Sequence, residues 1–138
     1  MRYMIIVKAS RESEAGEMPP QSLFDEMASY HEALANAGVL VEGSGLKPSS
    51  QGFRIRYEGD RRTVIDGPFA ETKELIAGYT IIDVASRDEA VAWAKRFPNP
   101  HVTGAVNEIE VRPFFELEDF ESVVKVERFR ELENRKPA

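Results

Sequence analysis

Short segments rich in β-branched and aromatic residues, or alternating between apolar and polar residues, predict strands along most of the chain. The predicted strands are residues 2–8, 39–41, 53–57, 62–65, 78–84 and 108–112. In the third of these, apolar residues alternate with Arg54 and Arg56, so one face of that strand is expected to meet water. Residues 58–60 form a turn, which predicts a hairpin with the next strand.

Two segments with apolar residues at helical spacing predict amphipathic helices. The first is expected to begin at Ser22, with Asp25 as its capping-box partner, and to end at Gly38. Its apolar face is expected to hold Leu23, Phe24, Met27, Ala28, His31, Leu34 and Ala35. The second follows a capping box at residues 86–89. Its shared face is expected to hold Ala90, Trp93, Ala94 and Phe97. The polar residues 11–20 are expected to form a loop.

The order of these elements is β-α-β, a hairpin, then β-α-β. It predicts an α+β fold of the ferredoxin-like, split βαβ type, an antiparallel sheet with helices on one face and an inserted hairpin. The second face of such a sheet needs cover, and a second protomer is expected to supply it in a homodimer. We expect a domain over residues 1–116 and a C-terminal extension over 117–138 that is helical, either solvated or in contact with the partner.

Composition and charge narrow the class of protein. The chain has 138 residues, no cysteine and a formal net charge of −6. It is therefore expected to be one domain without disulfides or thiolate metal sites. The acidic balance and the absence of a dense basic face argue against nucleic-acid binding. No apolar segment approaches the roughly 20 residues that span a bilayer, so we expect no membrane partner. The absence of cysteine fits a reducing environment, so we expect a cytoplasmic location.

Residues 66–74, which read Asp-Gly-Pro-Phe-Ala-Glu-Thr-Lys-Glu, carry the most specific motif of the chain. The glycine-aromatic strand 78–84 follows them, and residues 110–113 read Glu-Val-Arg-Pro. These features resemble the DGPF branch of the YCII-related family over roughly residues 1–116. The resemblance implies a ferredoxin-like fold that pairs into a dimeric α/β barrel. It also implies two kinds of role: cofactor-independent enzymes that use a His–Asp pair, one of them a dehydrochlorinase, and proteins associated with extracytoplasmic-function sigma factors.

Asp66 is the first candidate catalytic residue. A carboxylate at the end of a strand, beside a Gly-Pro turn, can be held in place and partly desolvated, which suits a general base. Alternatively, Asp66 bonds the backbone of its own turn. His31 is the second candidate, because a histidine near neutral pKa is the usual proton shuttle. Alternatively, it is a neutral core histidine, and in the relatives with a His–Asp pair the helix histidine corresponds to Met27 here.

Glu71 and Lys73 follow the turn and are candidates to orient an anionic or carbonyl substrate, or else they form a solvated turn. Met27, Phe69 and Tyr79 are candidates to line a pocket. The two histidines lack metal-ligand spacing, so no metal site and no cofactor are expected.

Two functions follow from these candidates. The first is an enzyme that carries out elimination, isomerisation or hydrolysis on a small organic molecule. The second is a non-catalytic dimeric module that binds or regulates a protein, for which the family resemblance implies an association with a sigma-factor system.

Overall fold

A computed structural model describes residues 1–101 and 106–135 of the chain. Its strands are β1 (Arg2–Lys8), β2 (Leu40–Gly45), β3 (Phe53–Glu58), β4 (Arg61–Asp66), β5 (Ile76–Asp83) and β6 (Ile109–Pro113). Its α-helices are α1 (Arg11–Glu14), α2 (Gln21–Asn36), α3 (Arg87–Lys95), α4 (Leu117–Phe120) and α5 (Glu127–Asn134). Two single-turn 3-10 helices, η1 (Ser49–Gln51) and η2 (Thr72–Glu74), lie on either side of the β3–β4 hairpin in the sequence.

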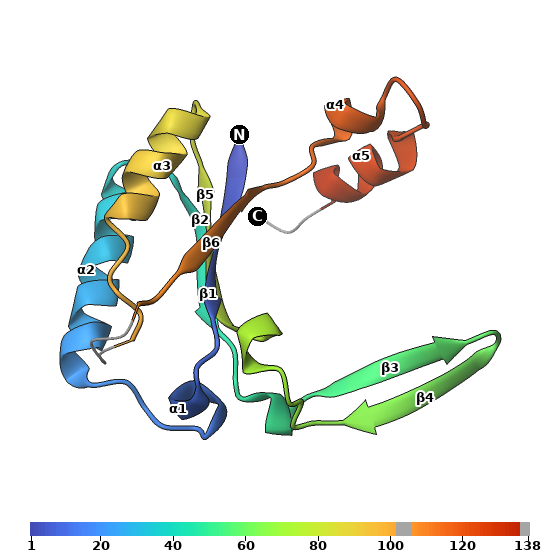
Figure 1. Cartoon of the computed structure of the whole chain (residues 1–138). Coiled ribbons are helices and arrows are strands. Elements are labelled where there is room, and N and C mark those ends of the chain that lie inside the picture. The colour runs from blue at the N-terminus through green and yellow to red at the C-terminus, as the bar shows by residue number, and fades with distance from the viewer. Residues whose placement is uncertain (102–105, 136–138) are drawn as a thin grey trace.

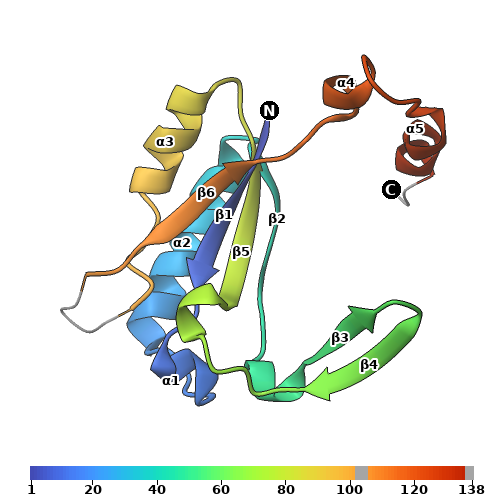
Figure 2. The same cartoon turned by 45° about the vertical axis from the view of Figure 1, so that its right-hand side comes forward.

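Four strands form one antiparallel sheet in the order β2-β5-β1-β6, and β3 and β4 form a separate two-stranded sheet. Helices α2 and α3 both lie on one side of the four-stranded sheet (Figure 1). The hairpin projects from the other side, as does the segment that carries α4 and α5 (Figure 2). This arrangement confirms the predicted α+β, split βαβ fold with an inserted hairpin.

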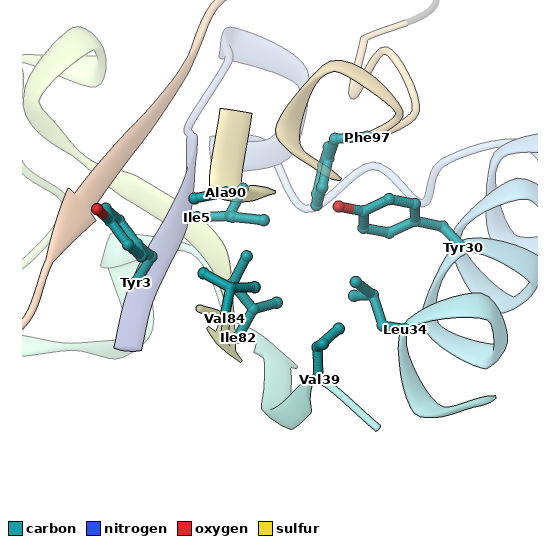
Figure 3. Close-up of a cluster of buried hydrophobic side chains, with 9 residues drawn as sticks. All are labelled: Tyr3, Ile5, Tyr30, Leu34, Val39, Ile82, Val84, Ala90 and Phe97. Carbon is teal, nitrogen blue, oxygen red and sulfur yellow. The ribbon is translucent and has the colours of Figure 1, made fainter. Parts of the chain in front are cut away.

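The core lies between the sheet and its two helices (Figure 3). Alternation along the strands decides which residues enter it, because every second side chain of a strand points to the same face. The strands contribute Tyr3, Ile5 and Ile82, the residues next to strand ends contribute Val39 and Val84, and the helical layer contributes Tyr30, Leu34, Ala90 and Phe97. The phenol of Tyr30 donates a hydrogen bond to the carbonyl of Trp93 at 2.8 Å, which joins α2 to α3.

The start of the first helix differs from its prediction. Helix α2 begins at Gln21 after Pro20, which offers no side-chain cap, so the expected capping box at Ser22 is wrong. Pro20 occupies the N-cap position with an extended backbone, at φ −65° and ψ 156°. Asp25 instead accepts a hydrogen bond from the Gln21 amide group at 3.0 Å. Beyond Asn36 the chain turns at Gly38, whose φ of 74° confirms the predicted helix stop.

The buried face of α2 is also shifted from the expected one. Phe24 is 50% exposed, whereas Tyr30, which the prediction left out, is only 5% exposed. Leu23 and Leu34 are buried as expected. The difference arises because the row through positions 23, 27, 30 and 34 faces the sheet, and Phe24 lies outside that row.

Two smaller corrections concern helix starts elsewhere. Residues 11–14 form the short helix α1 instead of a loop, because the side chains of Ser10 and Ser13 cap it reciprocally. At α3, Ser86 caps the amide of Glu89 as predicted. The carboxylate of Glu89 accepts from the amide of Ala85 at 2.9 Å, so only half of the expected capping box forms.

The hairpin and the C-terminal extension stand apart from the core. Every residue of β3 and β4 is exposed except Ile65, so the expectation of one wet and one covered face is wrong for a single chain. The extension contains two short helices instead of one, and residues 136–138 lie outside the described residues. No helix in the described part of the chain is long and apolar enough to cross a membrane.

Candidate functional site

The Asp-Gly-Pro-Phe loop, residues 66–69, closes the base of the hairpin against η1. The amide of Gly67 donates to the carbonyl of Gly52 at 3.0 Å, and the amide of Phe69 donates to the hydroxyl of Ser49 at 3.1 Å. A Cβ on Gly67 would lie 1.9 Å from the carbonyl oxygen of Ser49. Only glycine fits there, and the peptide bond to Pro68 is cis.

Two further side chains complete this contact, which we call the clasp and define by Glu14, Ser49, Arg54, Gly67 and Phe69. The Glu14 carboxylate accepts from both the amide and the hydroxyl of Ser49. The guanidinium of Arg54 lies 3.7 Å from the centre of the Phe69 ring, a cation–π contact. The motif therefore fixes where the hairpin leaves the fold, and Phe69 is a part of that support.

Asp66 is the last residue of β4 and pairs with Phe53 in the hairpin ladder. Its side chain is exposed, and the described residues offer its carboxylate no hydrogen bond or ion pair. Two hollows lie elsewhere, one of about 310 Å³ between α3 and β6 and one of about 460 Å³ beside Tyr30 and Arg96. In a single chain Asp66 is thus placed at the surface of the hairpin base, outside both hollows.

His31 lies on the helix-covered side of the sheet and is held at both ring nitrogens. Its Nδ1 is 2.8 Å from the carbonyl oxygen of Met27, and its Nε2 is 2.9 Å from the Thr80 hydroxyl. A carbonyl oxygen only accepts, so Nδ1 carries the hydrogen, and in the neutral ring Nε2 accepts from Thr80. Thr80 is 1% exposed. Gly43 leaves the space that this ring occupies, because a Cβ there would approach Nε2 to 3.0 Å.

The remaining candidates do not join these two. Glu71 precedes η2 and Lys73 lies within it, and both are exposed. Among the described residues, no hydrogen bond or ion pair connects Asp66, His31, Glu71 and Lys73 with one another. Met27 contacts His31 through its carbonyl, as given above, while Tyr79 points to the opposite face of the sheet.

That opposite face, which we call the open face, carries neither α2 nor α3 (Figures 1 and 2). Its members follow from strand register, since they alternate with the core residues. They are Arg2, Met4, Ile6 and Lys8 on β1, Tyr79, Ile81 and Asp83 on β5, Glu42 and Ser44 on β2, and Glu110 and Arg112 on β6. The face is therefore apolar along its middle and polar at both edges.

A tyrosine–carboxylate pair stands at the β2 edge of the open face. The phenol of Tyr79 donates to Oε1 of Glu42 at 2.6 Å. This hydrogen bond to the carboxylate raises the pKa of the Tyr79 phenol, since it favours the protonated form. Sequence reasoning singled out Tyr79 but missed Glu42, because the partner of a strand residue depends on register between β2 and β5.

The geometry gives little support for a metal. No group of three or more His, Cys, Asp or Glu side chains in residues 1–101 and 106–135 is placed to hold a metal ion. The polar groups around the candidate residues are carboxylates, a phenol, one helix histidine and hydroxyl groups.

Comparisons with known proteins give one family match and two similar proteins. The model of the YCII-related domain matches residues 1–115. An uncharacterised protein of Rhizobium meliloti (strain 1021) is 34% identical over 88 residues, which are 64% of this chain and 69% of that protein. A similar solved structure is 5-chloro-2-hydroxyhydroquinone dehydrochlorinase from Burkholderia phenoliruptrix in complex with 2,5-dihydroxybenzoquinone. It is 14% identical, with a TM-score of 0.41, and the match covers 84% of this chain and 95% of that one. This degree of structural likeness says nothing about what the present chain binds. The match over residues 1–115 shows that the chain belongs to the YCII-related domain family.

Proposed function

We propose that this YCII-related chain works as a homodimer in which two open faces meet and enclose a site for a small organic ligand. The observation that carries the proposal is the asymmetry of the sheet, whose two helices both cover the same face. A sheet with an apolar middle on its second face is stabilised when another layer covers that face. A second copy supplies such a layer with the same surface.

The open face also has the composition of a small-ligand site. Ligand sites combine apolar surface with a few placed polar groups that fix orientation. Met4 and Ile81 lie opposite each other on neighbouring strands, and the Tyr79–Glu42 pair lies at the edge. Because the Tyr79 hydroxyl already donates to Glu42, the pair offers acceptor oxygens to the hydroxyl groups of a small organic acid or carbonyl compound.

The dimer is tested by placing a charge on the open face. Ile81→Glu should convert the protein to a monomer, because a carboxylate in the apolar middle of the interface would lose its water. Sedimentation velocity measures the change, and Ala92→Glu, at an exposed position of α3, is the matched control that should stay dimeric. A wild-type chain that sediments as a monomer at every concentration would contradict the proposal, as would a dimeric Ile81→Glu variant.

The ligand is tested by thermal shift against a panel of small organic acids and carbonyl compounds. A ligand that binds only the folded protein raises the melting temperature by mass action. Wild type should be stabilised by at least one member of the panel, and Glu42→Gln should weaken that shift. Equal shifts in wild type, Glu42→Gln and Ile81→Glu would place the ligand elsewhere.

Cofactor-free proton transfer on a small organic substrate is the second candidate function, and the fixed ring of His31, on the helix-covered side of the sheet, favours it. Catalytic imidazoles are often oriented by a hydrogen bond at one nitrogen, as the Met27 carbonyl does here. In this proposal Asp66 is the base, His31 relays a proton, and Lys73 and Glu71 orient the substrate. Because Asp66 is exposed in a single chain, the second copy has to enclose it.

Exchange of substrate hydrogen for deuterium measures this chemistry without knowledge of the product. Wild type in heavy water should exchange an acidic C–H of a ligand found in the panel, and Asp66→Asn should abolish that exchange. The melting temperature should stay nearly unchanged, because the Asp66 carboxylate has no partner among the described residues. A lower melting temperature with unchanged exchange would make Asp66 a turn residue only.

A further inference from the structure

Two segments leave the fold on the side of the open face. The hairpin, which we call the arm (residues 53–66), departs after β2 at one end of the sheet. The C-terminal tail (residues 114–135) departs after β6 at the other end. Both views show these two segments on the side of the sheet away from α2 and α3 (Figures 1 and 2).

The arm is fixed at its base and unpacked along its length. Phe53, Tyr57 and Val64 are 64%, 66% and 61% exposed. An isolated two-stranded hairpin is marginal in water, and large exposed apolar side chains grouped on one element are typical of an interaction surface. The clasp nevertheless holds the base of the arm through hydrogen bonds to Ser49. The base of the arm is held in place while its apolar side chains stay exposed. This combination indicates that the arm contacts another molecule.

The tail has the same character. Its start is fixed because Arg2 makes two hydrogen bonds to the carboxylate of Glu116, at 3.0 and 3.1 Å. Beyond this anchor, Phe115, Val123 and Phe129 are largely exposed. Val126 is buried at 4% exposure, so the two short helices form a small folded unit around it. The apolar surface outside that unit is free to receive a partner element.

The two segments carry opposite charge. The arm has four arginines against three acidic residues, a balance of 4 − 3 = +1. Residues 114–135 have seven acidic residues against four basic ones, a balance of 4 − 7 = −3. Complementary charge steers association and fixes register. The arm therefore suits the tail better than it suits another arm.

We infer that in the homodimer the arm of one copy lies on the C-terminal tail of the other, so that each dimer contains two identical arm–tail contacts. The inference rests on the proposed pairing of open faces. A two-fold axis that runs across the strands between two facing sheets reverses the strand direction. It brings the end that carries the arm against the end that carries the partner's tail, and the contact is isologous.

Charge reversal in the full chain tests the electrostatic part. Arg56→Glu with Arg61→Glu should weaken the dimer about tenfold in sedimentation equilibrium, with a smaller effect at high salt. Both residues lie outside the clasp and have no ion pair in the described residues. Adding Glu127→Lys and Glu131→Lys should restore affinity. Arg87→Glu with Lys95→Glu, on the helical layer, is the matched control and should leave affinity unchanged.

Cross-linking tests the geometry, and the chain contains no native cysteine that would interfere. A mixture of Tyr57→Cys protein with Phe129→Cys protein, treated with a short bis-maleimide, should give a covalent dimer of one copy of each. Either variant alone should give much less. Efficient linkage of Tyr57→Cys to itself would show that arms meet arms and would overturn the inference.

The outcomes separate the two proposals. A wild-type monomer removes both the homodimer and the arm–tail contact. The homodimer stands and the arm–tail contact is removed under three joint results. Wild type is a dimer that Ile81→Glu dissociates, the charge reversals at Arg56 and Arg61 leave its affinity unchanged, and no mixed cross-link forms.

Discussion

On the helix-covered face of the sheet, Ile5, Leu34 and Ile82 have no exposed surface, and a phenol–carbonyl hydrogen bond joins the two helices above them. On the open face, Met4 and Ile81 are half-buried and the polar groups pair at the edges. The first face is covered by α2 and α3 of the same chain, whereas the second carries neither helix. Substitutions on the first face should therefore change the free energy of unfolding. Substitutions on the second should change dimer formation or the pKa of Tyr79.

The largest expected effect lies in the core. Leu34→Ala should lower the free energy of unfolding by about 2–5 kcal/mol, because it removes buried methyl groups and leaves a cavity. Phe24→Ala, on the same helix but half exposed, should cost much less. Urea denaturation measures both. Equal losses at the two positions would erase the contrast between the covered and exposed faces of α2.

The clasp is the next most sensitive place. Gly67→Ala should cost about 1–3 kcal/mol, because its Cβ would overlap the Ser49 carbonyl. Gly52→Ala is the control, since a Cβ there would stand at an ordinary 3.6 Å from the same oxygen. Denaturant melts give the stability. Proteolysis within residues 53–66 shows whether the arm is released, and an arm equally resistant in both variants would contradict the role of the clasp.

Tyr30 makes the covered face sensitive to alkali. Burial raises the pKa of its phenol from 10.0 to about 12, so its contribution to stability is complete below pH 10 and is lost as pH rises toward 12. Tyr30→Phe should cost about 1 kcal/mol at neutral pH through the lost bond to Trp93. Tyr30→Phe should also reduce the loss of stability above pH 10. Melting temperatures measured at a series of pH values would reveal this.

The smallest effect is expected at the edge of the open face. Glu42→Gln removes the carboxylate that raises the pKa of Tyr79, so that pKa should fall toward its ordinary value. The free energy of unfolding should hardly change. Ultraviolet titration of wild type, Glu42→Gln and Tyr79→Phe would identify the group, and an unchanged titration curve in Glu42→Gln would show that the pair is absent in solution.

Local patterns were sufficient for most of the fold. β-branched and aromatic residues indicated β1 and β5, alternation indicated β6, and the glycines at 38 and 59 marked a helix end and a hairpin turn. Patterns were insufficient where a partner decides the outcome. The alternation in β3 predicts a covered side, yet no element within residues 1–101 and 106–135 covers it. The burial of Tyr30 likewise depends on α3, which lies more than fifty residues away in the sequence.

The candidate site was predicted less well, for a related reason. The Asp-Gly-Pro-Phe motif correctly marked a special loop, but its glycine and phenylalanine are explained by contacts with Ser49 and Arg54. Local sequence does not tell whether a carboxylate such as Asp66 is later enclosed. The Tyr79–Glu42 pair depends on strand register, which neither strand specifies alone.

The close packing of Tyr30 against Trp93, with ring centres 6.3 Å apart, gives the molecule a built-in optical reporter. Trp93 is the only tryptophan in the sequence, so emission on selective excitation arises from one place between the two long helices. A change in the Trp93 emission would report the separation of α2 from α3. Dimer formation and ligand binding on the open face should hardly change the Trp93 emission, and a dye attached elsewhere would be needed to follow them.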